Sequence, residues 1–175
     1  SRHTRNAVHV ITTFDSGGSS AELRRAFDMP AVGDIRARIM ALADRSLEGN
    51  PEIVELLGYR LPKDAGPEAL HRELASLASG AHPLVAAIPE PMNEVVTQHL
   101  SAFRSLMPVD MDLAGASIGN LILTSGYLSL DRQLEPVVRV FSGMVQARGV
   151  VMPVADSCAH LCVRLENGEV IVGQH

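Results

Sequence analysis

The chain opens with an apolar run, a glycine-rich turn and a helix-forming segment in direct succession. Residues 7–13 are apolar and β-branched without strict alternation, which predicts a strand covered on both faces. Residues 15–20 read Asp-Ser-Gly-Gly-Ser-Ser, and Ser19 with Glu22 forms a capping box that predicts a helix start. Such a turn brings backbone N–H groups to an anion at the helix N-terminus, as in α/β proteins.

The rest of the chain is mostly helical in pattern. We expect helices over 33–46, 51–58, 67–79, 92–106, 117–128 and 131–148, a strand over 150–154, and a hairpin over 161–172. Asn167-Gly168 between alternating segments is a strong hairpin signal. Because a parallel sheet needs several strands, we predict one partial domain over 1–175. Its class is α/β, a Rossmann-like three-layer parallel sheet, incomplete, with a helical insert at about 47–107 and a C-terminal β-hairpin.

Composition excludes several classes of partner. The 175 residues carry 15 Lys and Arg against 20 Asp and Glu, a net charge of −5, and aromatic residues make up only 3%. Nucleic-acid binding needs a surplus of cations and aromatic stacking surfaces, so we expect no nucleic-acid partner. No apolar run approaches the roughly 20 residues that cross a bilayer, so we expect no membrane partner.

Cysteine usage predicts the compartment. Cys158 and Cys162 would lie about 13 Å apart on one strand, too far for a disulfide. We therefore expect two buried free thiols and a cytoplasmic protein. Together with His160 they could ligate a metal, but adjacent ligands on a strand lie about 6.6 Å apart, which is too far for tetrahedral zinc.

The glycine turn is the first candidate site. Gly17 and Gly18 can present backbone N–H groups, and Ser19 and Ser20 add hydroxyl donors. Asp15, at the end of the strand, can hold Mg²⁺ or accept a proton. Neither a dinucleotide fingerprint nor a Walker lysine is present, so a capped helix after a flexible turn is the alternative.

Arginines follow this turn closely. For Arg25 and Arg38 we favour solvated helix faces. Arg36 lies in the first turn of its predicted helix, where a cation is unfavourable unless an anion is nearby. Arg36 and the neighbouring Asp34 are therefore the more informative pair.

Residues 115–119 spell Gly-Ala-Ser-Ile-Gly, the pattern of a hydrolase nucleophile elbow, and Asp156 and His160 follow in the hydrolase order. The apolar strand that should precede an elbow is absent from the sequence pattern. The alternative is a helix N-terminus made of small residues that approaches a ligand. Ser117, Gly119 and the Asn120 amide would then contact a base, sugar or phosphate.

Several segments together resemble the CofD-like superfamily, and they occur in the same order as in that family. They are residues 13–24, 33–36 with 41–44, 117–123, 148–154, 160–161 and 166–168. One branch is 2-phospho-L-lactate transferase, which uses a guanosine-diphosphate-linked lactyl donor. The other is the bacterial gluconeogenesis factor, thought to bind UDP-sugars and regulate. The amino-acid sequence of residues 15–24 and the late hairpin are more similar to the second branch.

The sequence departs from the family pattern in three places. Ser16 replaces the second of two adjacent acidic residues, which puts a metal or acceptor site in doubt. The family's opening Gly-Gly-Thr-Gly loop and its later Gly-Pro-Gly-Ser segment have no counterpart here. We therefore expect a fragment that holds part of the family's binding site.

The resemblance implies a protein that binds a nucleoside-diphosphate-linked small molecule. As a transferase of phospho-groups it would use Asp15 as the catalytic and metal-contacting residue, with Mg²⁺ as a possible cofactor. The nucleotide would contact Gly17, Gly18, Ser19, Ser20, Arg36, Ser117, Gly119 and Asn120. The alternative is a regulatory protein that binds a UDP-sugar without turning it over. An incomplete sheet would also favour homo-oligomers.

Overall fold

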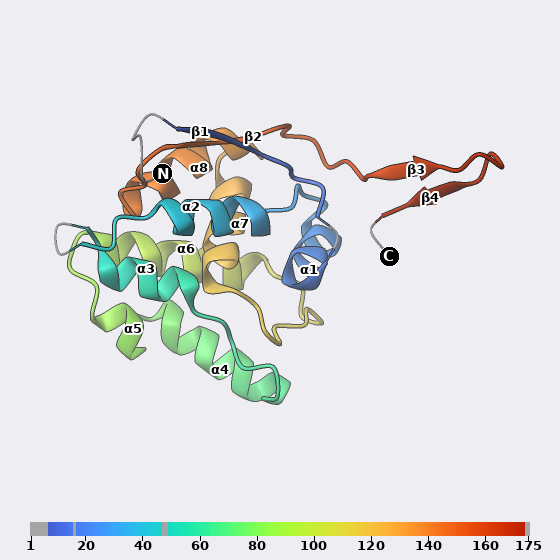
Figure 1. Ribbon diagram of the computed structural model, residues 1–175. Helices are drawn as coiled ribbons and strands as arrows, with labels where there is room; N and C mark the ends of the chain where they lie inside the picture. The colour runs from blue at the N-terminus through green and yellow to red at the C-terminus, as the bar shows by residue number, and fades with distance from the viewer. Residues whose placement is uncertain (1–6, 16, 47–48, 174–175) are drawn as a thin grey trace.

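Two strands that lie far apart in the sequence form the sheet. The computed structural model describes residues 7–15, 17–46 and 49–173. Strand β1 (Val8–Ile11) pairs in parallel with β2 (Val150–Pro153), with Val8 opposite Val150. Parallel strands require a crossover connection, and here the crossover contains all the helices (Figure 1). The predicted α/β class is confirmed.

The helices follow the predicted order. They are α1 (Gly18–Phe27), α2 (Gly33–Leu42), α3 (Pro51–Gly58), α4 (Pro67–Ala78), α5 (Pro83–Ala86), α6 (Met92–Leu106), α7 (Ile118–Ser129) and α8 (Leu134–Met144). Residues of the expected insert at about 47–107 contribute α3 to α6. These helices pack into the same core as α7, while their status as an insert stays a prediction.

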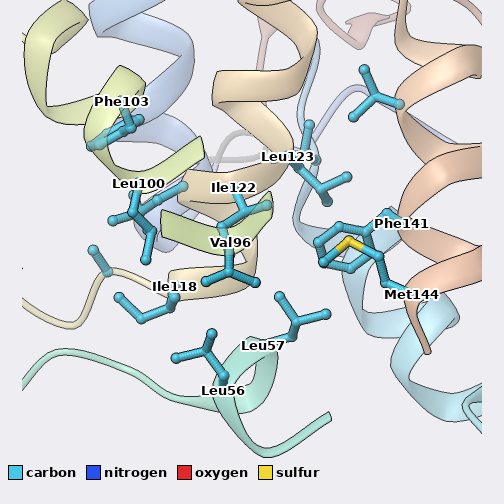
Figure 2. Close-up of a cluster of buried hydrophobic side chains, with 14 of the residues drawn as sticks. Leu56, Leu57, Val96, Leu100, Phe103, Ile118, Ile122, Leu123, Phe141 and Met144 are labelled. Atoms are coloured by element: carbon cyan, nitrogen blue, oxygen red, sulfur yellow. The ribbon is translucent and has the colours of Figure 1, made fainter. Parts of the chain in front are cut away.

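Helix α7 lies at the centre of the core. Its residues 118–127 are all buried, because its sequence is apolar or small on every face. Figure 2 shows its side chains meeting those of α3, α6 and α8. The labelled members are Leu56 and Leu57 from α3, Val96, Leu100 and Phe103 from α6, Ile118, Ile122 and Leu123 from α7, and Phe141 and Met144 from α8.

The sheet is covered on one face only, which differs from the prediction for 7–13. Side chains of Val8, Val10, Val150 and Met152 are exposed by 40–61% on the outer face. The opposite face, which includes Val151, packs on α2 and α8. Apolar residues on both faces predicted two covering layers, and the described residues supply one.

Helices α2 and α8 differ in their bounds from the sequence expectation. Helix α2 ends at Leu42 rather than near 46, because the chain turns to pair with 145–148: the Arg148 N–H donates to the Leu42 carbonyl at 2.8 Å. Helix α8 begins at Leu134 instead of at Asp131 and ends at Met144. Asp131 and Arg132 adopt left-handed conformations (φ 51° and 60°), which a helix cannot contain.

The predicted hairpin is present as β3 (Cys162–Arg164) and β4 (Val170–Val172), paired antiparallel. Gly168 in its turn has φ 88°, a value that favours glycine. The hairpin extends away from the helices (Figure 1), and all its strand residues are exposed. No helix in the described ranges is long and apolar enough to span a membrane.

The core position of α6 can be tested with a matched pair of substitutions. Val96 is fully buried, whereas Val109 is 97% exposed. We expect Val96→Ala to lower the free energy of unfolding by about 2 kcal/mol, from two lost methyl groups and the cavity they leave. Val109→Ala should change it by less than about 0.5 kcal/mol. Urea denaturation measures both, and equal effects would contradict the described packing.

Candidate functional site

Three helices bring their N-terminal turns together at one place. Ser19 lies at the start of α1, Arg36 in the first turn of α2 and Asn120 in the first turn of α7. Arg36 Nε donates to Asn120 Oδ1 at 3.0 Å, and Asn120 Nδ2 donates to Ser19 Oγ at 3.2 Å. These bonds link three of the residues that the sequence predicted as nucleotide contacts. We call this group the Ser19–Asn120–Arg36 chain.

Glycines allow this close approach. A Cβ at Gly119 would lie 2.6 Å from the Leu57 carbonyl oxygen and 2.8 Å from Arg36 Cδ. A Cβ at Gly33, the first residue of α2, would lie 2.4 Å from Ser20 Oγ. Both separations are too short for a larger residue, so the two glycines let the helix ends meet.

The electrostatics of this place favour an anion. The first N–H groups of each helix have no partner within the helix, and the helix dipole adds positive potential there. Arg36 is half-buried, and no carboxylate forms an ion pair with it among the residues that the structure describes. Burial lowers the pKa of Arg36 and the nearby Arg60 lowers it further, but a guanidinium remains a cation at neutral pH. An anion here would relieve an otherwise uncompensated charge.

Asn120 orients the guanidinium group of Arg36. It is 1% exposed, and its side-chain oxygen and nitrogen are both engaged, toward Arg36 and Ser19 respectively. Arg36 Nη1 and Nη2 have no hydrogen-bond partner within the described part of the chain. The bond to Asn120 therefore fixes the guanidinium while leaving its terminal donors for a ligand.

The glycine turn lies beside this chain but starts its helix differently from the prediction. Asp15 Oδ1 accepts a hydrogen bond from the Gly17 N–H at 2.9 Å. Helix α1 begins at Gly18 (φ 54°) with Gly17 as its cap and no side-chain cap, so the capping box is wrong. Glu22 pairs with Arg25 at 2.5 Å instead. Ser20 is buried, and Ser16, the departure from the family pattern, lies outside the described residues.

The part that Arg24 plays is not evident from the sequence. This arginine is only 7% exposed and donates to the carbonyls of Phe14 at 3.1 Å, Asp15 at 3.0 Å and Ala159 at 2.6 Å. It ties the Asp15 turn to the segment that leads to the hairpin. Nothing in the local sequence separates it from Arg25, which is exposed as predicted.

Ser117 is not placed as a nucleophile. It is fully buried, and its hydroxyl has no hydrogen-bond partner in the described ranges, His160 and Asp156 included. His160 lies instead beside Arg24, with both ring nitrogens 3.5 Å from Arg24 Nη2. Ser117 is held by its backbone, in a β-bridge with Arg60.

The two cysteines are free and exposed, which corrects the expectation of buried thiols. Cys162 is the first residue of β3, whose residues are all exposed. Cys158 lies on the segment before the hairpin, and its thiol donates to the Met29 carbonyl at 3.4 Å. Within the described ranges, no group of three or more His, Cys, Asp or Glu side chains is arranged to hold a metal. Asp15 is the acidic residue of the glycine turn, and a single carboxylate can contribute to a Mg²⁺ site when phosphates supply further oxygens.

The fold and this site define an α/β protein in which three helix N-termini and a half-buried arginine meet. Comparison with known proteins specifies the family: the family model described as 2-phospho-L-lactate transferase CofD matches residues 1–175, and the chain belongs to this family. The predicted resemblance to the CofD-like superfamily is confirmed.

Relatives of the chain occur in a yeast and in bacteria. An uncharacterized Saccharomyces cerevisiae protein, YNL011C, is 31% identical over 95% of this chain and 38% of its own length. The gluconeogenesis factor of Listeria monocytogenes is 26% identical over 94% of this chain and 35% of its own length. The crystal structure of protein BH3568 from Bacillus halodurans superposes with a TM-score of 0.61 at 22% identity, over 96% of this chain and 38% of that one. The chain thus spans little more than a third of these relatives.

The close approach at Gly119 gives a test of the site's geometry. We expect Gly119→Ala to destabilise the protein by about 1–3 kcal/mol, because the new methyl group displaces Arg36 or the Leu57 backbone. Gly143 is the matched control: it is also helical, and a Cβ there would meet nothing within 4 Å. Gly143→Ala should stabilise by roughly 0.5–1 kcal/mol, the helix preference of Ala over Gly. Thermal unfolding of both variants is the measurement, and a neutral Gly119→Ala would contradict the described junction.

Proposed function

We propose that the protein binds a nucleoside-diphosphate-linked small molecule, with the diphosphate at the junction of α1, α2 and α7. The observation that carries the proposal is the half-buried Arg36, which is oriented by Asn120 and has no ion-pair partner among the described residues. Helix N-termini and an arginine fork are both suited to phosphate oxygens. Membership of the CofD family, whose model is described as a 2-phospho-L-lactate transferase, supports this class of ligand.

Within this function we propose transfer of a phospho-group. An acceptor oxygen would form a new bond to a phosphorus of the donor, and the bond from that phosphorus to the bridging oxygen would break. The nucleoside monophosphate would leave, and the acceptor's proton would pass to a carboxylate, for which Asp15 is the candidate. Bound Mg²⁺ would offset diphosphate charge, with Asp15 contributing to its coordination.

The second candidate is a regulatory protein that holds a UDP-sugar without turnover. Several relatives are named gluconeogenesis factors, which favours this alternative. Binding needs only the donors described above, whereas transfer also needs an activated acceptor. Both candidates therefore share the site and differ in whether Asp15 acts on a reacting group.

Substitution of Arg36 tests the shared site. We expect Arg36→Met to raise the Kd for GDP or a UDP-sugar at least about tenfold, because a hydrogen bond to a charged group contributes roughly 1.5–3 kcal/mol. Arg38→Met is the control, since Arg38 lies exposed on the same helix. Isothermal titration calorimetry with and without Mg²⁺ measures the affinities. Equal affinity in the two variants would refute the location of the site.

Asp15 distinguishes the two candidates. In a transferase, Asp15→Asn should abolish turnover while the Kd for the nucleotide changes less. In a regulator, neither wild type nor variant should turn the ligand over. The measurement is product formation from a nucleoside-diphosphate-linked donor and an alcohol acceptor, beside the titration. Unchanged turnover in Asp15→Asn would exclude Asp15 as the catalytic residue.

A further inference from the structure

We infer that Arg60 and Lys63 form a second anion-binding subsite, beside the Ser19–Asn120–Arg36 chain. This inference rests on the proposed function, since it assigns a second charged group to the same ligand system. The sequence pattern singles out neither residue. The class of group it would take is a phosphate or carboxylate carried by the acceptor or by the distal part of the ligand.

A cavity with a volume of about 380 Å³ provides the space. Gly18, Ser19 and Glu22 of α1 line one side of it, and Arg60 and Lys63 lie on the loop between α3 and α4. Leu23, Leu121 and residues of 111–116 complete the lining. Ser19 belongs both to this cavity and to the hydrogen-bonded chain with Asn120, so the two places are adjacent.

The two cations are held by structure rather than carried on a free loop. The Leu61 N–H donates to the Ala116 carbonyl at 2.9 Å, and the Ile118 N–H donates to the Tyr59 carbonyl at 3.0 Å. Arg60 Nη1 donates to the Gly115 carbonyl at 3.0 Å. Gly115 has φ 68°, and a Cβ there would lie 3.1 Å from Lys63 Cγ, so the lysine stem rests over this glycine. The loop is therefore attached to the start of α7.

Both cations are exposed to solvent at the cavity. Neither Arg60 nor Lys63 forms an ion pair with any residue in the described ranges. Two carboxylates also line the cavity, and neither forms an ion pair with Arg60 or Lys63. Glu22 is paired with Arg25 at 2.5 Å, which is the main cause of its lowered pKa, and Asp112 Oδ1 accepts from the Ala114 N–H at 2.8 Å.

Arg60 also acts on the first site. Its charge is close enough to lower the pKa of Arg36, so the two guanidinium groups repel each other. Placing like charges together costs free energy unless anions lie near both. Two anionic groups on one ligand, or on a donor and an acceptor bound side by side, would offset that repulsion. Arginine and lysine both bind phosphate and carboxylate oxygens.

The experiment measures inorganic phosphate binding with and without saturating GDP. We expect Arg60→Met with Lys63→Met to weaken phosphate binding at least tenfold and to change the Kd for GDP by less than threefold. Lys63→Arg, combined with native Arg60, should retain most of the phosphate affinity. Arg104→Met serves as the control for loss of an exposed cation, because Arg104 lies on α6 outside this cavity. Thermal unfolding verifies that each variant is folded.

The outcomes separate this inference from the proposed function. If GDP binds and needs Arg36, but phosphate binds equally to wild type and to the double variant, the second subsite is refuted. If GDP and UDP-sugars fail to bind while phosphate binding needs Arg60 and Lys63, the subsite stands and the proposed function fails. Absence of phosphate binding to wild type in both conditions would also overturn the subsite. The same binding measurement with citrate in place of phosphate shows whether the subsite distinguishes a carboxylate from a phosphate.

Discussion

The burial of helix α7 is the constraint on which the rest of the structure depends. Its residues 118–127 are all buried, so helices α3, α6 and α8 must surround it. Because its start is fixed by hydrogen bonds to 59–61, the N-terminal residues Gly119 and Asn120 are held in the interior. A buried amide requires partners, and Arg36 and Ser19 supply them. Core packing and the candidate site are therefore one structure.

The same packing explains why the site is electropositive. Three helices can bring their starts together only where small residues permit it, and Gly33 and Gly119 stand at the contacts. The helix dipoles then add rather than cancel. Arg36 joins this junction as a cation without a carboxylate partner in the described part of the chain. Such an arrangement is unfavourable for stability alone, and this is the physical ground for the proposed ligand binding.

The apolar surface has a different distribution. The outer face of the sheet and the hairpin expose Val8, Val10, Val163 and Ile171, whereas the helical side is well covered. The relatives in this family are much longer than the chain, which spans 35–38% of those compared. The described residues thus form a folded core of helices with a partly covered sheet, and the site lies on the helical side of it (Figure 1).

The sequence by itself determined the α/β class, the order of the helices, the hairpin and the family, because these depend on local periodicity, turn residues and motif order. It also selected Ser19, Arg36 and Asn120 as candidates. Only the tertiary structure decided that they contact one another, since residues 84 and 101 positions apart are joined by packing and not by spacing. It likewise decided the role of Arg24, the exposure of both cysteines and the end of α2 at Leu42. Each of these depends on which distant segment lies alongside, and local patterns carry no such information.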